Sequence, residues 1–155
     1  MEINGFKILK STYMWEMLLI GFARSLAPIN TKITTATKAC GVGKVVGNKG
    51  GLQMYFKYND RYYNFIGCHL LHGQDNRLKR DDMMEDLIKA FRIDRNELDP
   101  DMIADYNFIM GDLNYRFEST YEEIVLTEKL KMAPQLIDHL DQLRMSCKGG
   151  QITIQ

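Results

Sequence analysis

Three segments of this 155-residue chain carry side chains that could bind phosphate or activate water. The first is Gly47-Asn48-Lys49-Gly50-Gly51. Glycines let backbone N–H groups approach an anion closely, and Lys49 adds a positive charge suited to phosphate. A glycine-rich turn with an exposed lysine is the alternative interpretation. The segment lacks the Gly-Lys-Ser/Thr of a Walker loop, and Gly41-Val42-Gly43 lacks the third glycine of a dinucleotide fingerprint.

The second segment, Cys68-His69-Leu70-Leu71-His72-Gly73, stands at the end of a predicted strand. An imidazole here can donate a hydrogen bond to a phosphoryl oxygen and stabilise developing charge. A histidine paired with a local carbonyl is the alternative. A zinc site built from Cys68, His69 and His72 is disfavoured, because successive strand residues point to opposite faces and no further clustered ligand is visible.

The third segment, Gly111-Asp112-Leu113-Asn114-Tyr115-Arg116, directly follows an apolar strand. With extended backbone, Asp112 and Asn114 project to the same side and can share one water, the carboxylate taking its proton and the amide holding it. Arg116 lies on the same alternation and could meet an anionic group. An Asx-type turn that closes the strand is the alternative.

The elements before and around the second segment are predicted to be strands. Segments Trp15–Leu26 and Lys32–Lys38 have strand-forming compositions. Residues Leu52–Tyr58 alternate between apolar and polar, Asn59-Asp60 supplies a turn, and Tyr62–Leu71 returns as a strand that is apolar on both faces. This pattern predicts a hairpin inside a layered fold.

Helices are predicted from the change of period after residue 76. One apolar stripe consists of Met84, Leu87, Ile88 and Phe91, with Lys79, Arg80, Asp82 and Glu85 among the solvated positions. A polar connection is predicted over Asn96–Asp101, and a short buried strand over Tyr106–Met110. Strands that alternate with helices indicate an α/β layered domain.

Two further helices and a last strand are predicted towards the C-terminus. Ser119 or Thr120 can cap a helix that carries Ile124 and Val125. Pro134 opens the next helix, whose stripe is Leu136, Ile137, Leu140 and Leu143. The tail Lys148–Gln155 begins an alternating strand and then stops, so we expect a chain that is cut short.

Composition limits the class of protein. The chain has 20 Lys and Arg against 20 Asp and Glu, and 45% of its residues are hydrophobic. This predicts one folded domain without the basic excess of a nucleic-acid binder. Cys40, Cys68 and Cys147 fit free thiols in a reducing compartment. The longest apolar run, Met17–Ala23, is shorter than the ~20 residues of a membrane span. With no signal peptide in Met1–Gly5, we expect a soluble, cytoplasmic protein.

Taken in order, the three segments resemble the inositol polyphosphate 5-phosphatase domain. That family has a Gly-Asn-Lys-Gly loop, a strand that ends in His-Leu with a nearby Gly-Gln, and the run Gly-Asp-Leu-Asn-Tyr-Arg. The matching residues are Gly47–Gly50, His69-Leu70 with Gly73-Gln74, and Gly111–Arg116, while Asp141-Gln142-Leu143 matches a further short signature. The resemblance covers roughly Trp15 to Leu143.

The resemblance implies a four-layer α/β/β/α sandwich of the deoxyribonuclease-like type. Residues 1–155 would form the central portion of such a domain, incomplete at both ends. The implied reaction is Mg²⁺-dependent hydrolysis of the 5-phosphate of a phosphoinositide or a soluble inositol phosphate. By position, the implied catalytic residues are Asp112 as general base, Asn114 as its partner in positioning the water, and His69 as a phosphate contact that stabilises the transition state. The implied substrate-phosphate contacts are Asn48, Lys49 and Arg116.

Some family segments have no counterpart in these 155 residues. The family's magnesium-binding glutamate stands in an upstream Gln-Glu segment, so the metal ligands here stay unassigned. The Pro-Ala-Trp-Cys-Asp-Arg and Ser-Asp-His segments are also missing, and Arg80-Asp81 stands where the family usually has Arg-Asn. Because phosphomonoester hydrolysis needs a very large acceleration, we expect little or no turnover from this chain alone.

Two alternatives stay open at this point. An endonuclease of the same fold shares the Asp-x-Asn chemistry, although the zero net charge disfavours DNA and no nucleic-acid partner is expected. A non-catalytic phosphoinositide-binding remnant would use Lys49 and Arg116 without chemistry. Peripheral membrane contact is compatible with a lipid substrate, and the sequence does not select one phosphoinositide.

Overall fold

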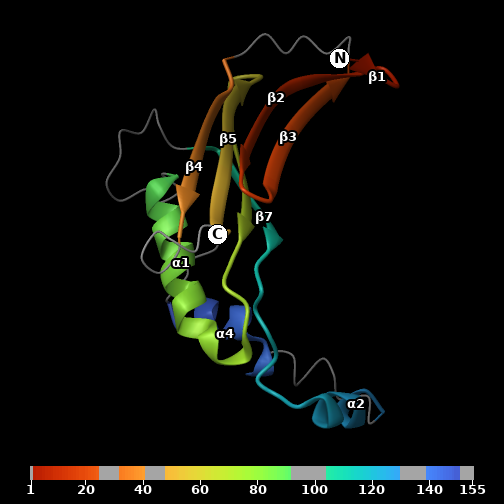
Figure 1. Ribbon diagram of the computed structural model, residues 1–155, viewed down its shortest axis with the longest axis vertical. Coiled ribbons are helices and arrows are strands. Elements are labelled where there is room, and N and C mark those ends of the chain that lie inside the picture. Colours follow the sequence, from red (N-terminus) through yellow and green to blue (C-terminus); the bar gives the residue numbers. More distant parts are fainter. Residues whose placement is uncertain (1, 25–31, 41–47, 92–103, 130–138, 151–155) are drawn as a thin grey trace. The chain divides into compact units, whose positions relative to one another are not determined.

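The structure is a computed structural model that describes residues 2–24, 32–40, 48–91, 104–129 and 139–150 (Figure 1). The chain forms two compact units, Met1–Leu70 with Asp86–Leu113 and Leu71–Glu85 with Asn114–Gln155. Several predictions concern residues outside the described ranges: the glycine-rich segment up to Gly47, the connection Asn96–Asp101, the helix start at Pro134 with Leu136 and Ile137, and the last five residues of the tail.

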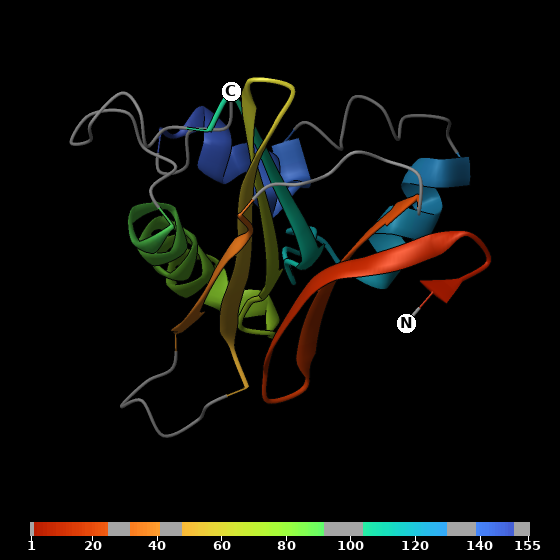
Figure 2. The same ribbon diagram turned by 90° about the horizontal axis from the view of Figure 1, so that it is seen from above.

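The first unit contains two sheets that face each other (Figure 2). One sheet has the order β1-β2-β3 and is antiparallel; its strands are β1 (Glu2–Ile3), β2 (Phe6–Met14) and β3 (Met17–Arg24). The other has the order β4-β5-β6-β7, and its strands are β4 (Thr34–Ala39), β5 (Gly50–Tyr58), β6 (Arg61–His69) and β7 (Tyr106–Asp112). Among the described strands of this sheet, β6 and β7 pair in parallel and the other neighbours are antiparallel. Strand β3 contacts β5 and β6, which joins the two sheets.

The β5–β6 hairpin confirms the predicted alternation. Asn59 and Asp60 form its turn with φ angles of 48° and 59°, the left-handed conformation that a tight hairpin turn requires at both central residues. Leu52 and Met54 are 1% and 2% exposed. An added Cβ at Gly21 of β3 would lie 2.8 Å from the Met54 sulfur, so the apolar face of the hairpin packs closely against the first sheet.

Helix α1 (Arg77–Ala90) follows a 3₁₀ turn, η2 (Gln74–Asn76). Three residues of the predicted stripe, Met84, Leu87 and Phe91, are at most 2% exposed. Leu87 and Phe91 lie against Gly51 of β5, where an added Cβ would be 2.9 Å from each side chain. In the first unit the layers are therefore sheet, sheet and helix.

The predicted burial is wrong for Arg80 and for β7. Arg80 is fully buried rather than solvated, because its guanidinium donates to the carbonyls of Leu71 and Gly73 at 3.0 and 2.7 Å. Tyr106 and Phe108 of β7 are 48% and 44% exposed, because β7 is the last strand of its sheet among the residues that the structure describes.

Stacked aromatic rings tie β7 to its neighbour. The ring centroids of Tyr63 and Tyr106 are 5.3 Å apart, and those of Phe65 and Phe108 are 4.8 Å apart.

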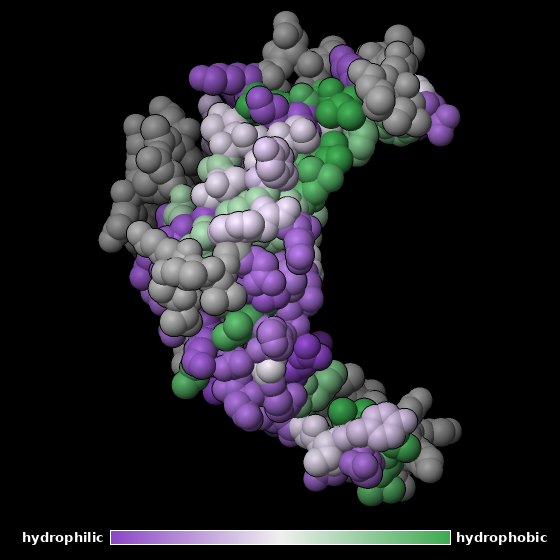
Figure 3. Space-filling view, viewed as in Figure 1, coloured by the Kyte–Doolittle hydropathy of each residue, from purple (hydrophilic) through white to green (hydrophobic). Residues whose placement is uncertain are grey.

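Exposed apolar side chains also occur on the first sheet, where Figure 3 shows hydrophobic surface over β2 and β3.

The second unit contains α2 (Tyr121–Lys129) and α4 (Gln142–Lys148). Thr120 caps α2 as predicted: its Oγ1 accepts from the Glu123 N–H, and its own N–H donates to the Glu123 carboxylate. Asp141 caps α4 by accepting from the Arg144 N–H. Among the described helices, none has the length and apolar character needed to cross a bilayer.

Candidate active site

Strand register brings the first group of predicted site residues together. Gly50 of β5 pairs with His69 of β6, and His69 pairs with Asp112 of β7. Directly paired residues present their side chains on the same face of a sheet. Lys49 immediately precedes Gly50, so three strands deliver Lys49, His69 and Asp112 to one end of the sheet. The Leu70 N–H donates to the Asp112 carbonyl at 2.9 Å and holds the last step of this register.

The His69 imidazole lies between a cation and a carboxylate. Its Nε2 atom is 2.5 Å from Lys49 Nζ and 3.6 Å from Asp112 Oδ2. An ammonium group only donates hydrogen bonds, so Nε2 is the acceptor in the contact with Lys49. Lys49 is 7% exposed, while the Asp112 side chain is 62% exposed. A sheltered cation beside an accessible carboxylate suits a site that binds an anion and activates a water. Asn48, next to Lys49, is exposed.

Gly111 lets β7 approach β6 at this point. Its φ is +121°, and an added Cβ would lie 2.2 Å from the Cys68 carbonyl oxygen. No side chain fits there without moving one strand away from the other. The close approach keeps Asp112 beside His69.

The cysteine thiols near these residues are not nucleophiles. Burial, helped by the Asp112 carboxylate, raises the pKa of Cys68 to about 12. Burial and the Asp86 carboxylate raise the pKa of Cys40 to about 11 against the opposing effect of Lys38. Because the thiolate is the reactive form, both thiols are unreactive near neutral pH. Cys40, Cys68 and Cys147 are thiols outside any disulfide, as predicted.

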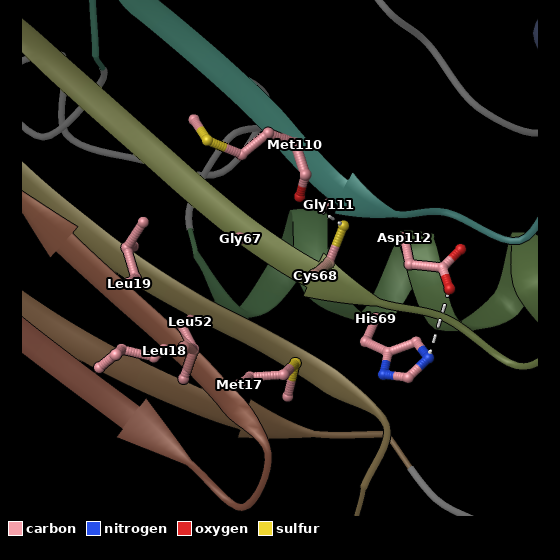
Figure 4. Close-up of a pocket in the computed structure, with 10 residues that line it drawn as sticks. All are labelled: Met17, Leu18, Leu19, Leu52, Gly67, Cys68, His69, Met110, Gly111 and Asp112. Atoms are coloured by element: carbon pink, nitrogen blue, oxygen red, sulfur yellow. Dashed lines mark hydrogen bonds and ion pairs between the residues drawn. The ribbon is translucent and has the colours of Figure 1, made fainter.

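A pocket of about 280 Å³ lies beside His69 and Asp112 in the first unit (Figure 4). Its remaining lining residues are Met17, Leu18, Leu19, Leu52, Gly67, Cys68, Met110 and Gly111. Figure 4 shows the imidazole and the carboxylate side by side at the ends of β6 and β7, with the apolar side chains of β3 along the opposite wall. The pocket therefore combines a polar end with an apolar wall.

The second group of predicted residues, Asn114 and Arg116, belongs to the second unit. The predicted alternation does not continue through them: β7 ends at Asp112, and Asn114 has a φ of +55°. Asparagine is one of the few residues that tolerate this left-handed conformation. The Arg116 guanidinium donates to Asn114 Oδ1 at 2.9 Å, so these two site residues lie together within their unit.

A buried carboxamide holds the backbone at Arg116. Gln142 Oε1 accepts from the Arg116 N–H at 2.9 Å and also from the Arg80 guanidinium. Its Nε2 donates to the Gln74 carbonyl at 2.9 Å and to Glu118 at 2.8 Å. Gln142 and Arg80 are both 0% exposed. The loop that carries Asn114 and Arg116 is thus fixed from the interior of its unit.

Asp81 holds the same loop through Tyr115. The Tyr115 hydroxyl donates to Asp81 Oδ1 at 2.7 Å, and the Ser146 hydroxyl donates to Oδ2 at 2.9 Å. Burial and the bond to Asp81 raise the pKa of Tyr115 well above its usual range, which keeps the phenol protonated as a donor. Sequence reasoning missed Asp81, Arg80 and Gln142 as supports of the loop. The available signals were the Arg80-Asp81 pair and the Asp141-Gln142-Leu143 signature, to which no role was attached.

The described residues do not by themselves fit a magnesium ion. Mg²⁺ prefers a near-octahedral set of oxygens that includes carboxylates. Around His69 the described residues offer the carboxylate of Asp112, and the Lys49 ammonium contacts the same ring nitrogen of His69. No cluster of three or more His, Cys, Asp and Glu side chains suited to a metal occurs in the part of the chain that the structure describes.

Comparison with known proteins identifies the class. The sequence model of the endonuclease/exonuclease/phosphatase family 2 matches residues 2–154, and the chain belongs to this family. The solved inositol polyphosphate 5-phosphatase domain of SPsynaptojanin, in complex with inositol (1,4)-bisphosphate and calcium, superposes with a TM-score of 0.74 and 26% identity. The match covers 96% of this chain and 43% of that domain. It confirms the expected α/β fold class.

Similar proteins of known activity place the chain within a smaller group of this family. The polyphosphatidylinositol phosphatase INP53 of Saccharomyces cerevisiae is 28% identical over 96% of this chain, and human synaptojanin-2 is 29% identical over 94%. This chain spans 14% of the length of INP53 and 10% of the length of synaptojanin-2. Within the family, the chain is therefore a homologue of the inositol polyphosphate 5-phosphatases, as its motifs predict.

Proposed function

We propose that this chain is part of an inositol polyphosphate 5-phosphatase that removes the 5-phosphate of a phosphoinositide or a soluble inositol phosphate. The observation that carries the proposal is the meeting of Lys49, His69 and Asp112 at the ends of three adjacent strands. The names of the relatives support the substrate class. The phosphate groups of such a substrate are anions, and a sheltered lysine beside an imidazole is suited to bind an anion.

In the proposed reaction, Lys49 and His69 bind the phosphoryl oxygens. Asp112 takes a proton from a water while the water oxygen attacks phosphorus; the bond from phosphorus to the inositol oxygen breaks, and that oxygen is protonated by solvent. Lys49 has three N–H donors, so it can bond a phosphoryl oxygen without leaving His69. The remaining predicted roles are the positioning of the water by Asn114 and further phosphate contacts by Asn48 and Arg116.

A divalent cation, Mg²⁺, belongs to the proposal as the cofactor. It would supply charge neutralisation for the phosphate. Among the described residues near His69, Asp112 can contribute one oxygen to the ion. For this reason we expect slow turnover from the 155-residue chain.

The test is phosphate release with Mg²⁺ from inositol 1,4,5-trisphosphate, with inositol 1,4-bisphosphate as the matched substrate that lacks the 5-phosphate. We expect slow release from the first and none from the second. Asp112→Asn should lower that release by at least about 10²-fold, the scale of a general base. Its affinity for the trisphosphate should be kept or increased, because a negative charge next to the phosphate is removed.

Two further variants test the anion site by calorimetry. Lys49→Gln should weaken trisphosphate binding by roughly tenfold or more, since bonds to charged groups contribute about 1.5–3 kcal/mol. Lys57→Gln, at the other end of β5, is the matched control and should bind normally. Absence of trisphosphate binding by the wild-type chain would refute the proposal. Binding that depends on Lys49, without any release that depends on Asp112, would favour the non-catalytic phosphoinositide-binding alternative.

A further inference from the structure

Three carboxamide side chains are joined across strands β5, β6 and β7. Gln53 Nε2 donates to Asn64 Oδ1 at 2.9 Å, and Asn64 Nδ2 donates to Asn107 Oδ1 at 2.9 Å. We call these three residues the amide ladder. Gln53 Nε2 also donates at 2.9 Å to the carbonyl of Phe91, which directly follows α1. The middle residue, Asn64, is 1% exposed and is therefore the buried centre of the ladder.

Asn64 lies on the buried face of β6 together with apolar residues. Ile66 and Cys68, which follow on the same face, are 1% and 4% exposed. Burial of an amide costs free energy unless its polar atoms are bonded, and here both the oxygen and the nitrogen are. A buried polar residue of this kind can specify one pairing of its strand, because other pairings leave it without partners.

The apolar face of β6 and β7 does not by itself select their register. A slip of two residues returns every side chain to its own face of the sheet. Phe65 pairs with Phe108, and after such a slip it would pair with Tyr106 or Met110. Both of these are large and mostly apolar side chains. Aromatic packing on this face would therefore tolerate a displaced β7.

The amide ladder selects the observed register. Asn64 and Asn107 are direct partners. A slip in one direction would place Ile109 beside Asn64, and the Ile109 side chain offers no acceptor. A slip in the other direction would place Asp105 there, away from the Arg61 guanidinium from which it accepts at 2.9 Å. Either slip breaks the bond between Asn64 and Asn107.

We propose that Asn64 is a positioning residue of the candidate active site, because its bond to Asn107 sets the register that places Asp112 beside His69. The inference rests on the proposed function. His69 and Asp112 pair five residues further along the same two strands. A slip of two residues would carry Asp112 about 6–7 Å along β6. The contact of 3.6 Å between His69 Nε2 and Asp112 Oδ2 would then be lost.

Phosphate binding should depend on the ladder less than catalysis does. Strands β5 and β6 form a hairpin, and its Asn59-Asp60 turn fixes their pairing independently of β7. Lys49 and His69 therefore stay together when Asp112 is displaced. Loss of the ladder bond to β7 should lower kcat through the general base and leave KM unchanged, because KM approximates the dissociation constant when chemistry is slow.

Two substitutions at Asn107 form a matched pair. The Asn107 side chain is exposed, so the strand should tolerate either change. Asn107→Asp keeps an oxygen that can accept from Asn64 Nδ2, whereas Asn107→Leu removes it. Gln53→Leu removes a ladder bond that does not reach β7 and is the control for the loss of such a bond alone. An effect of register should occur in Asn107→Leu and be absent from the other two variants.

Hydrogen exchange measures the register directly. The Leu70 N–H donates to the Asp112 carbonyl at 2.9 Å, and a slip of β7 breaks this bond. The Cys40 N–H donates to the Lys49 carbonyl at 2.9 Å and is the reference within each variant. Relative to that reference, exchange at Leu70 should accelerate about tenfold in Asn107→Leu, the scale of one hydrogen bond, and keep the wild-type rate in Asn107→Asp. Equal exchange at Leu70 in the two variants would overturn the proposal.

Mg²⁺-dependent phosphate release from inositol 1,4,5-trisphosphate adds a catalytic measurement. Asn107→Leu should lower kcat by about tenfold or more with KM unchanged, because a misplacement of about 1 Å can cost about 10²-fold in rate. Asn107→Asp and Gln53→Leu should keep the wild-type values. A raised KM in Asn107→Leu, or an equal fall of kcat in all three variants, would also overturn the proposal.

Exchange at Leu70 is measured without substrate, so it distinguishes this inference from the proposed function. Faster exchange in Asn107→Leu, in a chain that releases no phosphate, would refute the proposed function while supporting the register set by Asn64. Phosphate release that depends on Asp112, with equal exchange at Leu70 in both Asn107 variants, would refute the inference and leave the proposed function in place.

Discussion

At the scale of single residues, several candidate side chains are held by hydrogen bonds to other residues of the chain. His69 Nε2 accepts from the Lys49 ammonium, which comes from the start of a neighbouring strand. Arg116 bonds Asn114, and its own N–H is held by Gln142. The side chains that could do chemistry are therefore oriented before a ligand arrives.

Gln142→Leu tests the buried support of the Asn114–Arg116 loop. The substitution removes all four bonds of the carboxamide and leaves the buried Arg80 guanidinium one acceptor short. We expect the free energy of unfolding, measured in urea, to fall by about 2–4 kcal/mol. Arg144→Leu, an exposed position on the same helix, should change it by less than about 0.5 kcal/mol. Equal stability of Gln142→Leu and the wild type would show that the network contributes nothing.

At the scale of elements, the site depends on the parallel pairing of β6 and β7. The approach of the two strands is set at Gly111, where an added Cβ would lie 2.2 Å from the Cys68 carbonyl oxygen. The β5–β6 pairing adds Lys49 to the same end of the sheet. A displaced β7 would separate Asp112 from His69 without changing either residue.

Gly111→Ala should therefore lower both stability and function. The strained φ and the clash are expected to lower the free energy of unfolding by about 2–4 kcal/mol, and Mg²⁺-dependent phosphate release should fall with it. Gly67→Ala on β6 is the matched control, because its Cβ would meet only Leu19, at 3.8 Å, an ordinary contact. Denaturant unfolding compares the two variants. Similar stabilities would contradict the importance of the close approach.

At the scale of the whole molecule, each unit contains a carboxylate that folding keeps ionised. In the first unit, the Tyr62 N–H and the Arg61 guanidinium lower the pKa of Asp105 below its usual 3.8. In the second, the Thr120 N–H and the Ser119 hydroxyl lower the pKa of Glu123 below its usual 4.5. Folding therefore favours the ionised form of both groups.

Stability should accordingly fall in acid in both units. When folding lowers the pKa of a carboxyl group, the ionised group stabilises the folded state. This stabilisation is complete above the pKa of the group in the unfolded chain, and it is lost as the pH falls through the pKa of the group in the folded protein. The free energy of unfolding should thus decrease as the pH drops below about 4.5, and Asp105→Asn and Glu123→Gln should each make that decrease shallower. Unfolding in urea at a series of pH values measures it. A decrease of unchanged steepness in both variants would contradict the assignment.

Much of the fold was predictable from local pattern. Alternation in Leu52–Tyr58 indicated a strand, Asn59-Asp60 indicated its turn, and Thr120 indicated a helix cap, because each rests on the conformational preferences of neighbouring residues. Burial was less predictable. Arg80 is buried because carbonyls and Gln142 surround it, and β7 is exposed because it is the last of the described strands in its sheet. Both depend on partners that are distant in the sequence.

The order and identity of the motifs alone specified the chemistry that the chain can offer and the family to which it belongs. Residue types carry charge, proton affinity and hydrogen-bonding capacity wherever they are placed, so a lysine, a histidine and an Asp-x-Asn run already indicated an anion and a water. Folding decided which of them meet. The pairing of β5, β6 and β7 joins Lys49, His69 and Asp112, and the left-handed turn at Asn114 ends the alternation predicted for it. Strand register depends on contacts across the whole sheet, so no local segment could reveal it.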